Sequence, residues 1–200
     1  MLLLAGTGET AADWNCIAAD LARDRMVHAV DLRGHGLSSW PGEYSIQAMA
    51  DDVMELLPAL GGPVDLVGHS LGGLVAAHAA QDSQWVSRLV LEDVGLPRPR
   101  IPSTPTRPEG ALEFDWAMVE QIRPQIDQPD FPWEQIFSNI KVPTEIISGG
   151  RESFVPAELV EQLGGLIPDC SISTLQTGHL VHATDPDGFI RLVRAHLDGR

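Results

Sequence analysis

The stretch Gly68-His-Ser-Leu-Gly72 constrains the fold of this chain more than any other part of it. It directly follows the apolar run Val64–Val67 and lies just before Leu74–Ala80, a run typical of a buried helix. Between a strand and a helix, the pattern G-x-S-x-G is typical of a sharp turn that projects a serine hydroxyl out of a sheet. The free N–H groups of the following helix would stabilise negative charge near Ser70. A glycine-rich turn without catalytic function is the alternative, so the rest of the chain must supply the partners of a nucleophile.

Apolar runs with the length of buried strands alternate with amphipathic runs along the chain. Strands are expected at Leu2–Ala5, Met26–Val30, Val64–Val67, Ser87–Val94, Thr144–Ser148 and Ser171–Leu175. Helices are expected at about 10–23, 45–60, 74–80, 156–163 and 186–197. Strands that alternate with helices predict an α/β fold with a mostly parallel, doubly wound sheet of about six strands. A length of 200 residues predicts one domain over residues 1–200.

The alternation stops between Gly95 and Lys141. Five prolines in the stretch 97–108 exclude a helix or a central strand there. We therefore expect an insertion of about residues 95–141, either a substrate lid or a surface excursion whose aromatic side chains anchor it to the core. Trp116 and Met118, within this insertion, are candidates to line a substrate pocket, and simple packing is the alternative for both.

In an open parallel sheet, ligands bind beyond the carboxyl ends of the strands. Ser70, Glu152 and His179 each follow a predicted strand, in that order along the chain. A serine hydroxyl needs a base to remove its proton, and the histidine needs a carboxylate to orient it. The sequence thus predicts Ser70 as nucleophile, His179 as base and Glu152 as acid. The backbone N–H groups of Leu71 and Thr7 are the expected oxyanion hole.

Two of these roles have rival candidates. Asp93, at the end of the strand near Val94, is the alternative candidate for the acid, after Glu152. His182 is the alternative candidate for the base, after His179. A metal site of His179, His182 and Asp185 lacks a pattern of the H-E-x-x-H type, so neither a metal nor a cofactor is expected.

Several motifs together resemble the α/β-hydrolase-fold family, and they cover nearly the whole chain. They are Asp31-Leu-Arg-Gly-His-Gly36, Gly68-His-Ser-Leu-Gly-Gly73, Val142-Pro-Thr with Gly149 and Val155-Pro156, and Gly178-His179. The resemblance implies a serine–acid–histidine hydrolase with a cap between the strand ending near Val94 and the one starting near Thr144. Gly6 and His69 then fall where a substrate pocket is expected.

The chain departs from the family pattern at three points. Ala5-Gly6 stands where the family usually has His-Gly, which removes a side chain that often braces the oxyanion loop. Glu152 stands where aspartate is commoner. The chain also starts in what resembles the family's third strand. Either this is a minimal member with six strands, or the true start lies upstream of Met1; without the first two strands, the strand around Val27–Val30 is expected to form an edge.

Charge and composition limit the partners. The formal net charge of −15 argues against nucleic acid and anionic membranes, and it would not repel a neutral or cationic substrate. A small ester-like molecule is the expected partner. Cys16 and Cys170 fit no C-x-x-C spacing and are expected to be small buried side chains, which favours a cytoplasmic protein. No signal peptide and no membrane-spanning run are expected, and no oligomeric state is predicted.

Together these features predict a serine hydrolase that cleaves a carboxylic ester, thioester or amide of a small apolar acyl group through an acyl-enzyme. The same triad on this fold also serves carbon–carbon bond hydrolysis, acyl transfer and perhydrolysis, because a fold does not determine its reaction. A non-catalytic ligand-binding protein that has kept the pocket is the alternative from another class.

Overall fold

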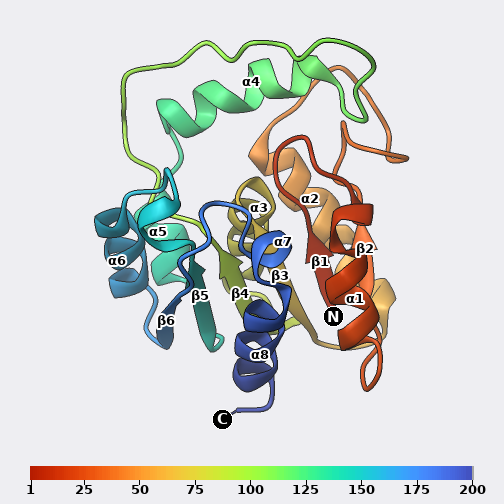
Figure 1. The fold of residues 1–200 in the computed structure, drawn as a ribbon, viewed down its shortest axis with the longest axis vertical. Helices are drawn as coiled ribbons and strands as arrows, with labels where there is room; N and C mark the ends of the chain where they lie inside the picture. The colour runs from red at the N-terminus through yellow and green to blue at the C-terminus, as the bar shows by residue number, and fades with distance from the viewer. Residues whose placement is uncertain (200) are drawn as a thin grey trace.

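A six-stranded, entirely parallel sheet forms the centre of the computed structural model, which describes residues 1–199 (Figure 1). Its strand order is β2-β1-β3-β4-β5-β6. The strands are β1 (Leu2–Leu4), β2 (His28–Val30), β3 (Val64–His69), β4 (Val86–Glu92), β5 (Thr144–Ser148) and β6 (Cys170–Thr174). The predicted fold class is confirmed, and each predicted strand overlaps an observed one.

Helices cover both faces of the sheet (Figure 1). One face packs against α2 (Ile46–Leu56), α3 (Leu71–Ala80), α5 (Trp133–Ser138) and α6 (Ala157–Leu166). The other packs against the 3-10 helix η1 (Ala11–Trp14), α1 (Asn15–Leu21), the short α7 (Val181–Thr184) and α8 (Pro186–Leu197). Two further short 3-10 helices are η2 (Leu57–Leu60) and η3 (Gly150–Glu152).

Alternation along the strands explains the two layers. Leu2 and Leu4 of β1 belong to the core beneath α2 and α3, whereas Leu3 between them belongs to the core beneath α1 and α8. Successive side chains of a strand point to opposite faces, so an all-apolar run is what a strand buried on both faces requires. The same alternation recurs at Leu66 and Val67 of β3.

The helix after the predicted elbow lies at the centre of the molecule. All residues of α3 are buried, which fits its composition of alanine, glycine and aliphatic residues with a single histidine. A helix that is apolar on all sides is stable only when it is surrounded by protein. It starts at Leu71, three residues earlier than the predicted run, so its first turn lies directly after Ser70.

The segment between β4 and β5 contains two helices with different surroundings. α4 (Trp116–Asp127) lies across the top of the molecule in Figure 1, beyond the ends of the strands. α5 packs against α3 and α6, with Trp133 and Phe137 buried, so it is part of the helical layer over the sheet. The proline-rich stretch before α4 is without helix or strand up to Glu113, as expected.

Two smaller expectations have different outcomes. β2 is an edge strand, as predicted. The expected burial of Cys16 is wrong, because its side chain lies on the exposed side of α1, while Ile17 and Leu21 occupy the buried side. Cys170 is partly buried at the start of the other edge strand, β6.

Candidate active site

Ser70 occupies a strained turn between β3 and α3. Its backbone has φ 49° and ψ −114°, a region that residues other than glycine rarely adopt. The turn is closely packed, since a Cβ atom at Gly68 would lie 2.4 Å from the Gly72 carbonyl oxygen. A Cβ atom at Gly72 would lie 2.3 Å from the carbonyl oxygen of Leu4. Glycine at both positions is therefore a steric requirement of the elbow.

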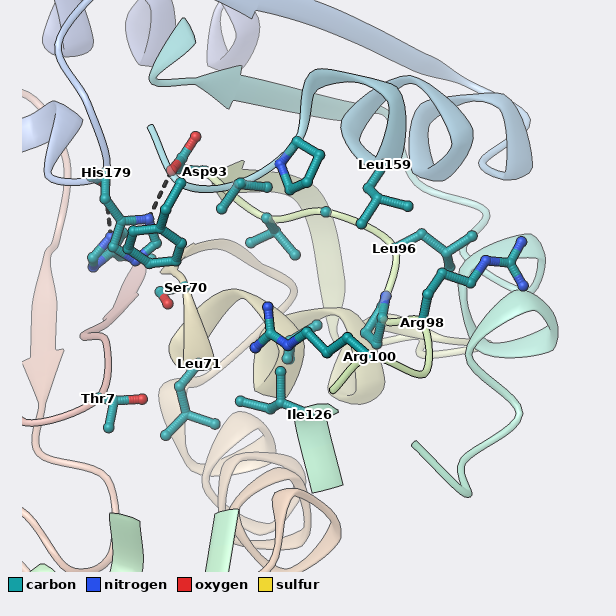
Figure 2. A pocket seen from close by; sticks show the side chains of 18 of the residues that line it. Thr7, Ser70, Leu71, Asp93, Leu96, Arg98, Arg100, Ile126, Leu159 and His179 are labelled. Carbon is teal, nitrogen blue, oxygen red and sulfur yellow. Dashed lines mark hydrogen bonds and ion pairs between the residues drawn. The ribbon is translucent and has the colours of Figure 1, made fainter. Parts of the chain in front are cut away.

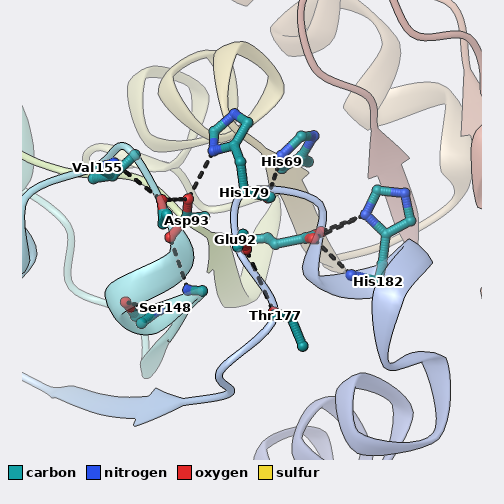
Figure 3. Close-up of polar contacts among 12 residues, drawn as sticks. His69, Glu92, Asp93, Ser148, Val155, Thr177, His179 and His182 are labelled. Atoms are coloured by element: carbon teal, nitrogen blue, oxygen red, sulfur yellow. Dashed lines mark hydrogen bonds and ion pairs between the residues drawn. The ribbon is translucent and has the colours of Figure 1, made fainter.

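His179 meets a carboxylate, and this carboxylate is Asp93. Nδ1 of His179 lies 2.7 Å from Oδ2 of Asp93, and both side chains line the same cavity as Ser70 (Figures 2 and 3). The Ser70 hydroxyl has no hydrogen-bond partner among residues 1–199, so it is free to turn toward the ring. The ring of Phe154 lies 4.1 Å from that of His179, centroid to centroid.

Asp93 is held in place by the loop that follows β5. Its Oδ1 accepts a hydrogen bond of 2.8 Å from the Gly149 N–H, and its Oδ2 accepts one from the Ser153 hydroxyl. The carboxylate is only 1% exposed, and these donors together with His179 satisfy it. The backbone of Asp93 has a positive φ of 48°, which turns the side chain away from the direction of the strand.

Glu152, the predicted acid, does not contact His179. Its side chain is exposed and makes no hydrogen bond or ion pair with any described residue. The loop around it contributes Gly149 and Ser153, which donate to Asp93 instead. Asp93 thus makes the contact with His179 that was predicted for Glu152. The turn at Asp93 brings its shorter side chain to the histidine.

The predicted oxyanion donors lie beside the nucleophile. Thr7 and Leu71 both line the cavity next to Ser70, and neither backbone N–H donates a hydrogen bond to another described residue (Figure 2). The loop that carries Thr7 is braced on both sides. The Gly6 N–H donates to Glu9 Oε2 at 2.6 Å, and the Gly8 N–H donates to His35 Nε2 at 3.1 Å.

His69 connects this loop to the loop of the base. Its Nδ1 lies 2.8 Å from Glu9 Oε2, and its Nε2 donates to the backbone carbonyl of His179 at 3.0 Å. Burial opposes protonation of this ring, but the charge of Glu92 and the hydrogen bond that the ring donates to Glu9 outweigh it and raise the pKa of His69 to about 9. His69 and Glu9 thus supply a brace for the oxyanion loop where the chain has Ala5.

His182, the rival base, lies outside the cavity. Its Nδ1 is 2.9 Å from both carboxylate oxygens of Glu92 (Figure 3). Its ring stacks on that of Trp14, with 4.3 Å between the ring centroids. The side chains of His182 and Glu92 are buried, and neither residue is among those that line the cavity. This histidine–carboxylate pair is therefore part of the core and supports the position of α7.

The cavity around Ser70 has a volume of about 990 Å³. Of the candidate pocket residues, His69 lines it, whereas Gly6, Trp116 and Met118 are not among the described residues that do. Met118 is fully buried in the core beneath α4 instead. The face of α4 toward the cavity carries Val119, Ile122, Arg123 and Ile126. Their spacing of three and four residues is the signal that could have identified this face.

No helix in the described part of the chain, residues 1–199, is long and apolar enough to cross a membrane.

The profile of the alpha/beta hydrolase family matches residues 1–156. The chain is 44% identical to an uncharacterized protein of Mycobacterium tuberculosis over 98 residues, which cover 48% of this chain and 29% of that protein. It is 42% identical over 80 residues to the pimeloyl-[acyl-carrier protein] methyl ester esterase of Klebsiella pneumoniae, covering 40% of this chain and 30% of the esterase. The match to the mouse sn-1-specific diacylglycerol lipase ABHD11 is 25% identical and covers 98% of this chain and 80% of the lipase.

Solved structures show the same fold. The chain superimposes on E-2-(acetamidomethylene)succinate hydrolase with a TM-score of 0.84 at 21% identity, covering 99% of this chain and 91% of that one. It superimposes on the Mycobacterium tuberculosis esterase Rv0045c with a TM-score of 0.76 at 24% identity, covering 98% and 83%. The family profile spans more than half of the chain and the sheet has the same architecture, so this protein belongs to the alpha/beta hydrolase family.

Proposed function

We propose that this protein is a serine hydrolase that cleaves a carboxylic ester of a small apolar acyl group through an acyl-enzyme, with a thioester or an amide as less favoured substrates. The observation that carries the proposal is the contact between His179 Nδ1 and Asp93 Oδ2, in the same cavity as the strained Ser70. The two unused N–H groups of Thr7 and Leu71 complete the set of groups that acyl transfer needs.

In the first half of the reaction, the Ser70 oxygen attacks the ester carbonyl carbon and Nε2 of His179 takes the hydroxyl proton. Asp93 holds the other ring nitrogen as a donor and stabilises the imidazolium that forms. The carbonyl oxygen becomes an oxyanion, which accepts hydrogen bonds from Thr7 and Leu71. When the carbon–oxygen bond to the alcohol breaks, His179 returns the proton to the alcohol.

In the second half, water replaces the alcohol. His179 removes a proton from the water, the hydroxide oxygen attacks the acyl carbon, and the same two N–H groups stabilise the second oxyanion. The bond to the Ser70 oxygen then breaks, Ser70 regains its proton from His179, and the carboxylic acid leaves.

The cavity wall supports an apolar acyl group. Aliphatic side chains from three different parts of the chain face the space beside Ser70, namely Leu71 and Leu74 of α3, Ile122 and Ile126 of α4, and Leu159 of α6. We infer that residues 95–141 act as the cap of a single domain, since α4 and the stretch before it form one wall of this cavity. The printed names of an esterase and a lipase among the relatives are consistent with ester chemistry.

The test is turnover of a p-nitrophenyl ester series, from acetate to octanoate, by the wild type and four variants. Ser70→Ala and His179→Ala should each lower kcat by about 10³-fold or more. Asp93→Asn should lower it by about 10²- to 10⁴-fold, because the histidine loses its orienting charge. Glu152→Gln is the matched control and should leave kcat within about twofold of the wild type.

Two results would count against the proposal in different ways. If Glu152→Gln lowered kcat as much as Asp93→Asn, the catalytic acid would be Glu152. A folded wild type that turns over no ester and whose Ser70 is not labelled by a fluorophosphonate would favour the non-catalytic binding protein.

A further inference from the structure

Three arginines line the cavity of this acidic protein. Apart from Glu9, Asp93 and the histidines that they contact, the charged residues of the wall are Arg98, Arg100, Arg123 and Glu158. The cavity lining thus holds three of the 13 basic residues, in a chain that has 28 acidic ones. The following contacts show which of these guanidinium groups are available to bind a ligand.

A buried carboxylate at the end of α4 orients two of these arginines. Asp127 is 1% exposed, and it accepts a hydrogen bond of 2.6 Å from Nε of Arg100 and one of 2.8 Å from Nε of Arg123. One negative charge thus stands between two positive charges. Arg123 and the Ser103 N–H both donate to Oδ2 of Asp127, whereas Arg100 donates to Oδ1, so this carboxylate fixes the Nε edge of the Arg100 guanidinium.

The three arginines differ in which nitrogens remain available. Both terminal nitrogens of Arg98 are engaged, by Glu134 and Gln162, and Nη2 of Arg123 donates to Ser103. Nη1 and Nη2 of Arg100 have no partner within residues 1–199. Figure 2 shows the Arg100 side chain extending from the stretch before α4 into the cavity, toward the side on which Ser70 and Leu71 lie.

We propose that Arg100, oriented by Asp127, is an anion subsite that binds a carboxylate or phosphate carried by the substrate at a distance from the scissile carbonyl. The free pair of Nη groups has the fork geometry that binds a carboxylate or phosphate with two parallel hydrogen bonds. The aliphatic residues between Ser70 and Arg100 would hold an apolar spacer. The substrate is then an ester with an apolar chain that ends in an anion, an assignment that rests on the proposed function of Ser70.

The first experiment compares esters that differ only at the far end. The wild type is assayed on mono-p-nitrophenyl esters of dicarboxylic acids from adipate to sebacate, on their neutral methyl-capped forms, and on the p-nitrophenyl alkanoates of equal length. For at least one length, kcat/KM should be roughly ten- to a hundredfold higher for the anionic ester than for its methyl-capped form.

Variants of Arg100 assign that preference to the subsite. Arg100→Gln should abolish the preference of the anionic ester over its methyl-capped form, while Arg100→Lys should retain part of it because the charge remains without the fork. Arg107→Gln removes the same charge from the same segment, at an exposed position outside the cavity, and should change nothing. Thermal unfolding of each variant verifies that it is folded.

A binding measurement separates this proposal from the hydrolase proposal. Calorimetry with Ser70→Ala protein, with and without Arg100→Gln, compares hexanoate, hexyl phosphate and hexanamide. At least one anion should bind roughly tenfold more tightly than the amide, and only when Arg100 is present. The tighter of the two anions tells whether the subsite is made for a carboxylate or a phosphate.

The possible outcomes are distinct. Neutral esters that are cleaved without any preference for the anionic forms, or anions that bind no better than hexanamide, would overturn the subsite and leave the hydrolase intact. Binding of an anion that depends on Arg100, in a wild type that cleaves no ester, would establish the subsite and refute the hydrolase.

Discussion

His69, the residue before the nucleophile, joins two loops of the site through one buried ring. It contacts Glu9, which in turn holds the Gly6 N–H, and it donates to the backbone carbonyl of His179. A ring in this position fixes the oxyanion loop and the base relative to each other. The residue also carries a charge, since a pKa of about 9 keeps it protonated at neutral pH.

The raised pKa of His69 predicts a pH dependence of stability. A folded-state pKa above the usual value of 6.5 adds stability that is fully present below about pH 6.5 and is lost as the pH rises through about 9. The contribution is on the order of 3 kcal/mol. Urea unfolding at several values between about pH 6 and about pH 10 measures this. Over that range, the free energy of unfolding of the wild type should fall by this amount relative to that of His69→Gln.

The reference variant removes the ionisable ring and keeps a side chain that can donate a hydrogen bond. The ionisable groups that face His69 are Glu9, Glu92, His179 and His182, and all four remain in both proteins. Parallel pH curves for wild type and variant would show that His69 is neutral in the folded protein.

At the scale of elements, the contact between α3 and β1 decides whether the elbow can form. The helix starts immediately after Ser70, and Gly72 in its first turn lies against the backbone of Leu4. A Cβ atom at Gly68 would likewise collide with the carbonyl oxygen of Gly72. Three backbone segments thus meet without intervening side chains, and this close approach gives the nucleophile its position.

A pair of glycine substitutions tests this element. Gly72→Ala should lower the free energy of unfolding by more than about 2 kcal/mol, because its Cβ atom would lie 2.3 Å from a backbone oxygen that cannot move aside. Gly165→Ala, on the exposed side of α6 with nothing within 4 Å, should raise it by about 0.5–1 kcal/mol. Urea unfolding measures both, and equal effects would mean that the close approach at Gly72 is not rigid.

At the scale of the whole molecule, charge is the dominant feature. A net charge of −15 on 200 residues opposes the compact state through repulsion among the acidic side chains. The arginine cluster of the cavity lies within this negative field. The anionic substrate that we propose would therefore be recognised by local contacts, because the long-range field does not attract it.

Salt should stabilise this molecule. Raising NaCl from about 20 mM to about 0.5 M at neutral pH shortens the screening length and should increase the Tm by a few degrees. The control is the same comparison near the sequence pI of 4.6, where the net charge is small and the salt effect should vanish. An equal increase at both pH values would assign the effect to the apolar surface and not to charge.

The outcome at particular residues shows what can be predicted from sequence. Ser70 and His179 could be predicted to lie at one site because each follows a strand, and the carboxyl ends of parallel strands meet at one edge. The carboxylate that contacts His179 could not be predicted in the same way, since Glu152 and Asp93 both follow strands and the order of the chain does not distinguish them. Only the left-handed turn at Asp93, and the donors that the next loop brings to it, select one of the two.

By itself the sequence determined the α/β class, the strand positions, the elbow and the edge that gathers the reactive side chains, because local periodicity and the sterics of glycine act over a few residues. The tertiary structure decided which carboxylate meets His179, that Met118 lies in the core while Ile122 and Ile126 face the cavity, and that Arg100 points into it. These outcomes depend on how α4 and the loops dock, and docking is set by contacts between residues that are distant in sequence.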